Sequence, residues 1–229
     1  MIPKAILCVL VLAVLAMPVC GQETAEEWID EGIALYEQGK YNESIQAYDE
    51  AIQLDPENAA AWTNKGLALE MQGKYNESIQ AYDEAIRLDP ELADAWYNKG
   101  NALYEQSKYD EAIQAYDETI RIEPEDTVVW NNKGNALFNQ GEYNESIHAY
   151  DEAIRLDPED AAAWTNKGVA LGIQGKYDEA LPHFDEATRL DPEYAVAWYN
   201  KGLALEALGR TSEADEAYAK AQELGLGVQ

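Results

Sequence analysis

The chain has 229 residues and a formal net charge of −28, because 44 Asp and Glu residues outnumber 16 Lys and Arg residues. So acidic a surface repels phosphate backbones and anionic lipid headgroups, which excludes nucleic acid as an expected partner. The two cysteines, Cys8 and Cys20, both lie near the N-terminus, so no disulfide is expected in the rest of the chain.

The N-terminal stretch 1–21 differs from all that follows. Lys4 precedes the uncharged apolar run "AILCVLVLAVLAM", which is followed by "PVCGQ". A cation, a short apolar run and a small-residue exit are typical of a secretory signal peptide, which is predicted at residues 1–21. The alternative is an uncleaved anchor at 5–21, although this uncharged stretch is at the short limit for a bilayer span. The predicted location is secreted or cell envelope, or membrane-anchored by residues 5–21.

Tryptophans divide the remainder of the chain at one fixed interval, the interval that separates Trp28 from Trp62. They are Trp28, Trp62, Trp96, Trp130, Trp164 and Trp198. In the third unit, apolar and small residues recur at helical spacing over 94–106 and again over 110–122. Ser107 separates the two stretches where the other units have glycine, Asp110 is the predicted N-cap of the second, and Pro124 ends it. Each unit is therefore predicted to be a helix–turn–helix.

The spacing within each unit also resembles a known family. From Trp96, Gly follows four residues on, Leu seven on, a small residue sixteen on, Tyr twenty on, and a closing Pro comes later. This pattern resembles the tetratricopeptide repeat (TPR) and covers residues 25–228, in units near 25–58, 59–92, 93–126, 127–160, 161–194 and 195–228. The resemblance implies an all-α fold, an α-solenoid of six helix–turn–helix repeats in a right-handed superhelix. It also implies a non-enzymatic scaffold for protein–protein interaction with a concave groove.

Several constant positions have physical interpretations. Gly66 lacks a Cβ, so the two helices of its unit can approach closely, and small residues such as Ser78 are expected to meet it. The repeat explains the tryptophans as core residues rather than as an aromatic ligand cage. The lysines three residues after Trp are expected to face the preceding repeat and to pair with carboxylates such as Asp89 or Glu123.

A helical wheel places positions one, two, five, eight and nine after each Trp in the predicted groove. Asparagine recurs two residues after five of the tryptophans, and a primary amide can both donate to and accept from a peptide backbone. The alternative is that asparagine is simply common at this family position. Aromatic side chains without a packing role are candidate anchors for a partner. The predicted peptide-binding residues are Asn64, Asn98, Asn132, Asn166, Asn200, Tyr97, Asn101, Tyr104, Asn131, Asn135, Phe138 and Tyr199.

The motif "YNES" occurs three times and makes Asn42, Asn76 and Asn144 N-glycosylation sequons. The alternative is sequence drift, because other units read "YDEA" at this place.

No motif predicts catalysis. After residue 21 the chain has His148 and His183 but no thiol, and neither a phosphate-binding loop nor a calcium loop can be recognised. We therefore predict no enzyme activity, no cofactor and no metal site. The expected partner is a protein or an extended peptide, with the membrane involved only if residues 5–21 are retained. The alternative function is a self-associating structural or assembly protein of the cell envelope.

Overall fold

The computed structural model describes residues 23–226, which form twelve α-helices in six consecutive pairs and include no strand. The helices are α1 (Ala25–Glu37), α2 (Tyr41–Leu54), α3 (Ala59–Glu70), α4 (Tyr75–Leu88), α5 (Ala93–Glu105), α6 (Tyr109–Ile122), α7 (Thr127–Gln140), α8 (Tyr143–Leu156), α9 (Ala161–Ile173), α10 (Tyr177–Leu190), α11 (Ala195–Ala207) and α12 (Thr211–Glu223). The predicted all-α solenoid is confirmed. The predicted signal peptide lies outside the described residues.

Capping chemistry fixes where the first helix of several pairs begins. Thr24 forms a capping box with Glu27 at the start of α1, and Asp126 accepts from two backbone amides at the start of α7. The second helices start differently, without a side-chain cap. The prediction of Asp110 as an N-cap is wrong: α6 begins at Tyr109 after Lys108, so Asp110 lies in the first turn, where its charge still favours the helix dipole.

Each helix pair closes on a glycine in its first helix. A Cβ on Gly66 would lie 2.4 Å from Cε1 of Tyr82, so the aromatic ring fills the place of the missing side chain. The ring, and not Ser78, therefore supplies the atoms nearest to this Cβ position, whereas in the first repeat the equivalent Ser44 does meet its glycine, because its hydroxyl donates to the Gly32 carbonyl oxygen at 2.8 Å. Ser78 itself is fully buried, and its hydroxyl donates to the Tyr75 carbonyl oxygen at 3.0 Å.

From the second repeat on, each tryptophan holds the loop that enters its repeat through a hydrogen bond. The indole Nε1 of Trp96 donates to the carbonyl oxygen of Pro90 at 3.0 Å, and Trp130 makes the same bond to Pro124 at 3.2 Å. All six tryptophans are half-buried. Their prediction as core residues therefore holds only in part, because each indole keeps contact with solvent.

Lysines tie each repeat to the one before it, as predicted, but to different carboxylates. Lys99 pairs with Asp83 at 2.6 Å, and its Nζ lies 5.3 Å from the ring centroid of Trp96. Lys133 likewise pairs with Asp117, so Asp89 and Glu123 are not the partners. The reason is geometric, since the lysine reaches the middle of the preceding second helix rather than its C-terminal end.

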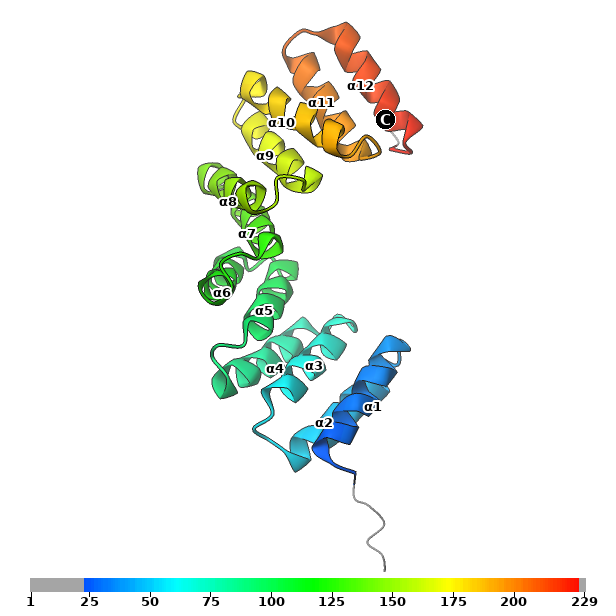
Figure 1. The fold of residues 1–229 in the computed structure, drawn as a ribbon, viewed down its shortest axis with the longest axis vertical. Coiled ribbons are helices and arrows are strands. Elements are labelled where there is room, and N and C mark those ends of the chain that lie inside the picture. The colour runs from blue at the N-terminus through cyan, green and yellow to red at the C-terminus, as the bar shows by residue number, and fades with distance from the viewer. Residues whose placement is uncertain (1–22, 227–229) are drawn as a thin grey trace, which may run out of the picture.

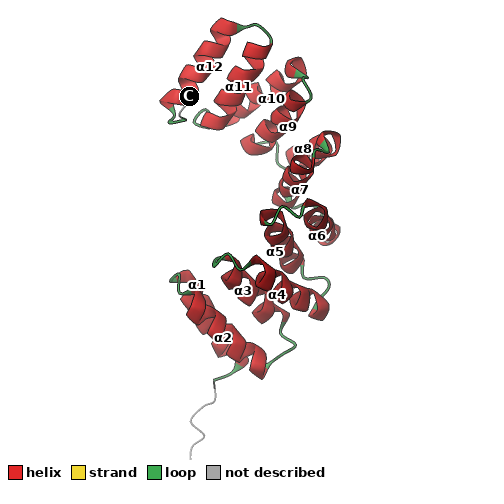
Figure 2. Cartoon of the chain, turned by 180° about the vertical axis from the view of Figure 1, so that it is seen from behind, coloured by secondary structure: helices red, strands yellow, loops and turns green. Residues whose placement is uncertain are grey.

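The pairs stack into a crescent, seen from two sides in Figures 1 and 2. Each second helix contacts the first helix of the next pair, and several first helices also contact each other, as α3 does α5 and α9 does α11. Figure 1 shows α5 and α7 towards the hollow of the crescent and α6 and α8 on its outer side. The first helices therefore form the concave face. Among the described residues no helix is both long and apolar enough to cross a membrane.

Candidate peptide-binding groove

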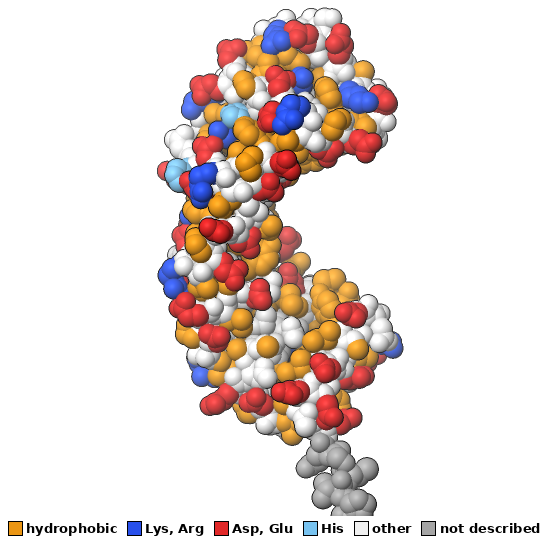
Figure 3. All heavy atoms as spheres, viewed as in Figure 1, with side chains coloured by type: hydrophobic (Ala, Val, Ile, Leu, Met, Phe, Trp, Pro, Cys, Tyr) orange, Lys and Arg blue, Asp and Glu red, His pale blue; other side chains and the backbone are white. Residues whose placement is uncertain are grey.

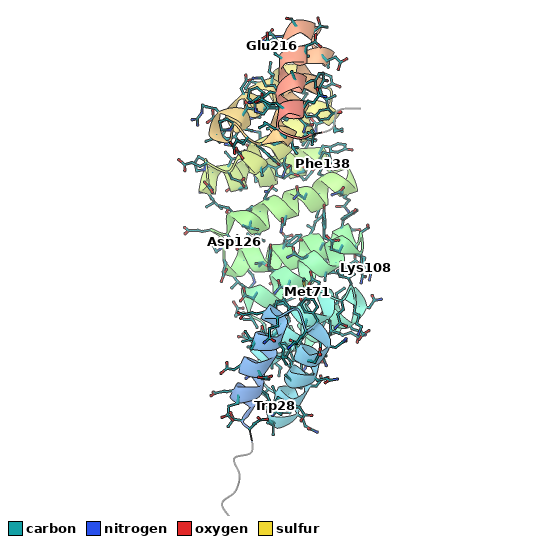
Figure 4. All side chains as sticks on the ribbon, turned by 90° about the vertical axis from the view of Figure 1, so that its right-hand side faces the viewer. Trp28, Met71, Lys108, Asp126, Phe138 and Glu216 are labelled. Atoms are coloured by element: carbon teal, nitrogen blue, oxygen red, sulfur yellow. The ribbon has the colours of Figure 1, made fainter. Side chains whose placement is uncertain are left out.

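The concave face is a groove between two rows of loops. Figure 3 shows the hollow in profile, bordered by apolar and acidic side chains. Figure 4 looks into it, with Phe138 and Lys108 near one edge and Asp126 near the other. Lys108 belongs to a turn within a helix pair and Asp126 to a loop between pairs, so these two kinds of connection form the two rims.

The predicted residues of the third and fourth repeats form one hydrogen-bonded cluster. The Asn132 amide nitrogen donates to the Tyr97 hydroxyl at 3.1 Å and to Asn101 Oδ1 at 3.4 Å. The Tyr116 hydroxyl, from the second helix of the third repeat, donates to the same Asn101 oxygen at 2.8 Å. The structure thus brings Tyr97, Asn101 and Asn132 together across the junction of α5 and α7.

The same arrangement recurs one repeat later. The Asn166 amide nitrogen donates to Asn131 Oδ1 at 3.0 Å and to Asn135 Oδ1 at 3.3 Å. The Tyr150 hydroxyl donates to Asn135 Oδ1 at 2.8 Å. Asn200 differs, because it donates to the Val196 carbonyl oxygen of its own helix at 2.8 Å. The asparagine series is therefore not one uniform ladder: in the middle repeats its nitrogens brace neighbouring repeats, which fixes their orientation.

The other two members of the series, Asn64 and Asn98, are half-buried at the same register in α3 and α5. The hydrogen bonds between repeats begin only after them: Asn132 donates to a side chain of the third repeat, and Asn166 to a side chain of the fourth.

The predicted aromatic anchors are half-buried, and each packs against a tyrosine of the second helix of its own pair. Tyr104 meets Tyr109 at 5.6 Å and Phe138 meets Tyr143 at 5.3 Å, both edge to face. Tyr199 lies 5.7 Å from a tyrosine of α12. One face of each ring is thereby held, which leaves a rigid aromatic surface at the groove.

Sequence reasoning did not select the apolar residues of the groove as contacts. Within residues 23–226 seven large hydrophobic side chains are exposed, and four of them, Ile33, Met71, Ile173 and Leu203, occupy the groove positions of the helical wheel. They come from the first, second, fifth and sixth repeats, one from each, so the concave face exposes apolar side chains along its length that a partner could cover. The signal was present in the sequence as the apolar residues at positions five and nine after Trp.

A pocket of about 220 Å³ opens in the middle of this face, where α3, α5 and α7 meet. It is lined by Glu70, Asn101, Tyr104, Glu105, Tyr116, Asn132 and Asn135. Burial raises the pKa of the Glu70 carboxyl above its usual range; the Tyr82 hydroxyl, which donates to it at 2.9 Å, opposes this, and the nearby Glu105 adds to it. The pocket therefore contains a carboxylate that is costly to keep ionised.

The sequons lie at the starts of second helices, directly after the turns within the helix pairs. Asn42, Asn76 and Asn144 are exposed second residues of α2, α4 and α8, and each accepts a hydrogen bond from a glutamine of the next repeat, such as Gln106 to Asn76 at 3.0 Å. The sequon serines are fully buried. A glycan would therefore have to be attached before the helices form, and glycosylation stays a prediction.

Within residues 23–226, no group of three or more His, Cys, Asp or Glu side chains is arranged to hold a metal ion. His148 and His183 lie on different second helices, α8 and α10.

Comparisons with known proteins agree with this architecture. The family model of the tetratricopeptide repeat matches residues 29–93, and that of the Cilia and flagella-associated protein 70 C-terminal domain matches residues 91–229. The fold is similar to YrrB, described as a TPR protein with an unusual peptide-binding site, at 26% identity and a TM-score of 0.66, over 79% of this chain and 93% of YrrB. It is also similar to the MamA protein, at 25% identity and a TM-score of 0.70, over 76% of this chain and 94% of MamA. PilF of Pseudomonas aeruginosa has 18% identity and a TM-score of 0.74, over 89% of this chain and 93% of PilF, and at this identity the likeness shows the fold alone. No curated protein matches the chain.

Proposed function

Because this chain belongs to the tetratricopeptide-repeat family, we propose that it is a non-enzymatic scaffold that binds an extended segment of a partner protein in its concave groove. The observation that carries the proposal is the gathering of exposed apolar side chains and braced aromatic and amide groups on that one face. The peptide-binding site of YrrB, which has the same fold, supports it.

The chemistry of the groove suits an extended peptide. Apolar and aromatic side chains can bury the partner's side chains, while the amide oxygens of Asn132 and Asn166 can accept hydrogen bonds from its backbone N–H groups. The amide nitrogens of these two residues already donate to the neighbouring repeat, so the surface is organised before the partner arrives. Such preorganisation lowers the entropic cost of binding.

A random-sequence nonapeptide library tests the proposal. We expect the full chain to bind a fraction of the peptides, and a groove variant with Asn98→Ala, Asn132→Ala and Tyr104→Ala to lose them while its circular dichroism stays helical. The matched control carries Gln80→Ala and Gln114→Ala, two exposed residues of α4 and α6 on the outer side. Equal binding by the wild type and the groove variant would refute groove binding.

The alternative is that the chain associates with copies of itself as a structural or assembly protein. The exposed apolar residues, such as Ile33 and Leu203, could equally be covered by a second copy. Analytical ultracentrifugation separates the two functions: a mass that rises with concentration, together with no peptide binding, would favour self-association.

We further propose that residues 1–21 are a cleaved signal peptide and that the scaffold acts outside the cytoplasm. The apolar run after Lys4 supports this proposal. N-terminal sequencing of the protein recovered from the producing cells tests it, because a chain that still begins at Met1 would indicate an anchor or no export.

A further inference from the structure

Resting on the proposed function, we propose that the pocket between α3, α5 and α7 is a specificity pocket for one basic side chain, lysine or arginine, of the bound peptide segment. The pocket lies midway along the groove and is far larger than the roughly 10–15 Å³ that a single water requires. It therefore has room for the end of a long side chain.

The charges of the pocket select for a cation. Glu70 and Glu105 contribute two carboxylates from successive repeats, and neither forms an ion pair within residues 23–226. The nearest periodic cations, Lys65 and Lys99, are already paired with Asp49 and Asp83 of the preceding repeats. A basic side chain of a partner would supply the charge that this part of the chain does not.

The free-energy cost of keeping Glu70 ionised also favours a cationic ligand. The Glu70 carboxylate is half-buried, receives one hydrogen bond from Tyr82, and lies near a second carboxylate, that of Glu105. A group in this state destabilises the free protein, and glutamine would keep the Tyr82 bond without the charge. A positive ligand group would offset that cost on binding, because an opposite charge stabilises the ionised carboxylate.

The remaining walls fit the stem of such a side chain. The half-buried Tyr104 ring offers an aromatic surface for an aliphatic stem or a cation, and its hydroxyl is held by Asn139 at 2.8 Å. Asn101 Oδ1 already accepts from Tyr116 and Asn132, which fixes the wall of the pocket. Binding therefore requires little rearrangement.

The long-range field of the protein favours the same ligand. A net charge of −28 attracts basic segments and repels acidic ones. The field that guides the encounter and the pocket that holds the side chain therefore both favour a basic segment. A divalent cation fits less well, because the described residues contain no group of three His, Cys, Asp or Glu side chains that could hold one.

Four nonapeptide libraries with a fixed central residue test the proposal. The centre is lysine, arginine, glutamate or norleucine, and the flanking positions are random. We expect the full chain to bind the lysine or arginine pool at least about ten-fold more tightly than the other two at physiological salt. The double variant Glu70→Gln and Glu105→Gln should lose this preference.

The matched control is Glu37→Gln with Glu206→Gln. These residues stand at the corresponding register in the first and last repeats, and Glu206 receives a hydrogen bond from Tyr218 as Glu70 does from Tyr82. The control removes the same charge and should keep the preference. An equal loss in both variants would mean bulk electrostatics and would overturn the proposal.

The outcomes also separate this inference from the proposed function. If all four pools bind alike and the Asn98, Asn132 and Tyr104 variant abolishes binding, the groove binds peptide but the pocket does not select a cation. If no pool binds, or if the groove variant binds as the wild type does, groove recognition itself fails.

Discussion

The imidazole of His183 stacks on the indole of Trp164, with ring centroids 5.5 Å apart and planes 28° apart. In α10, His183 occupies the position at which the preceding repeats bury Ala115 and Ala149. Its Nδ1 is the one buried side-chain nitrogen or oxygen without a hydrogen-bond partner in the described chain. The fifth repeat thus replaces a small core residue by a titratable ring.

Acid should destabilise the chain through this ring. Burial first, and then Lys167, lower the pKa of His183, while Asp151 and Glu179 oppose them. The unfolded chain therefore binds the proton more readily, so the stability of neutral His183 is complete above about pH 6.5 and is lost as the pH falls. Relative to His183→Ala, the free energy of unfolding of the wild type should decrease below that pH, by at most about 1.4 kcal/mol per unit. Urea denaturation of both proteins across pH measures this, and a pH-independent difference would contradict it.

The turn of the third repeat carries a correctable strain. Ser107 has φ 58°, a left-handed conformation that five other repeats give to glycine, such as Gly73 at φ 71°. We expect Ser107→Gly to raise the free energy of unfolding by about 0.5–1 kcal/mol, since relief of strain exceeds the added entropy of the unfolded chain. The reverse change, Gly73→Ser, should destabilise the protein by a similar amount. Thermal unfolding of the two variants checks both signs.

Two glycines of α9 should respond oppositely to alanine. A Cβ on Gly168 would lie 2.6 Å from the Phe184 ring, whereas at Gly172 the nearest atom is 4.0 Å away in Tyr177. Gly172→Ala should therefore stabilise the helix by about 0.5–1 kcal/mol. Gly168→Ala should destabilise the protein by about 1–3 kcal/mol, because the ring must move. If both changes shift the unfolding midpoint in the same direction, the packing described at Gly168 is wrong.

The glycine contacts also illustrate how far the sequence could predict this molecule. Gly66 could be identified as a place of close approach because a glycine recurs four residues after every tryptophan and has no Cβ. It did not identify Tyr82 as the neighbour, and Ser78 was expected instead. The residue that faces a glycine depends on how the two helices cross, which a wheel drawn for one helix does not contain.

The groove shows the same limit. The wheel selected the face that carries Asn101, Asn132 and Asn166, and the structure places these residues there. Their mutual hydrogen bonds were missed because they depend on the rotation of one repeat against the next. The partners of the lysines were missed for that reason too, with Asp83 in place of Asp89 for Lys99.

Two substitutions at Lys99 distinguish the contribution of its charge to stability from that of its aliphatic stem. Its side chain is 22% exposed and Asp83 is 52% exposed, so the ion pair is largely screened and should contribute under about 1 kcal/mol. Its aliphatic stem reaches Asp83 past the Trp96 ring. We expect Lys99→Met to cost about 0–0.5 kcal/mol and Lys99→Ala about 1 kcal/mol or more. Chemical denaturation at low and high salt measures both, and equal losses in the two variants would mean that the charge dominates.

Glu70→Gln should stabilise the free protein while weakening its recognition of basic peptides. Burial raises the pKa of this carboxyl, so the folded chain binds the proton more readily than the unfolded one. Its cost is therefore present at neutral pH and disappears as the pH falls through the folded pKa towards the ordinary value of 4.5. Glutamine keeps an acceptor for the Tyr82 hydroxyl without the charge. The unfolding midpoint of Glu70→Gln should exceed that of the wild type at pH 7 and approach it near pH 4, whereas a midpoint below the wild type at pH 7 would show that the carboxylate contributes to folding.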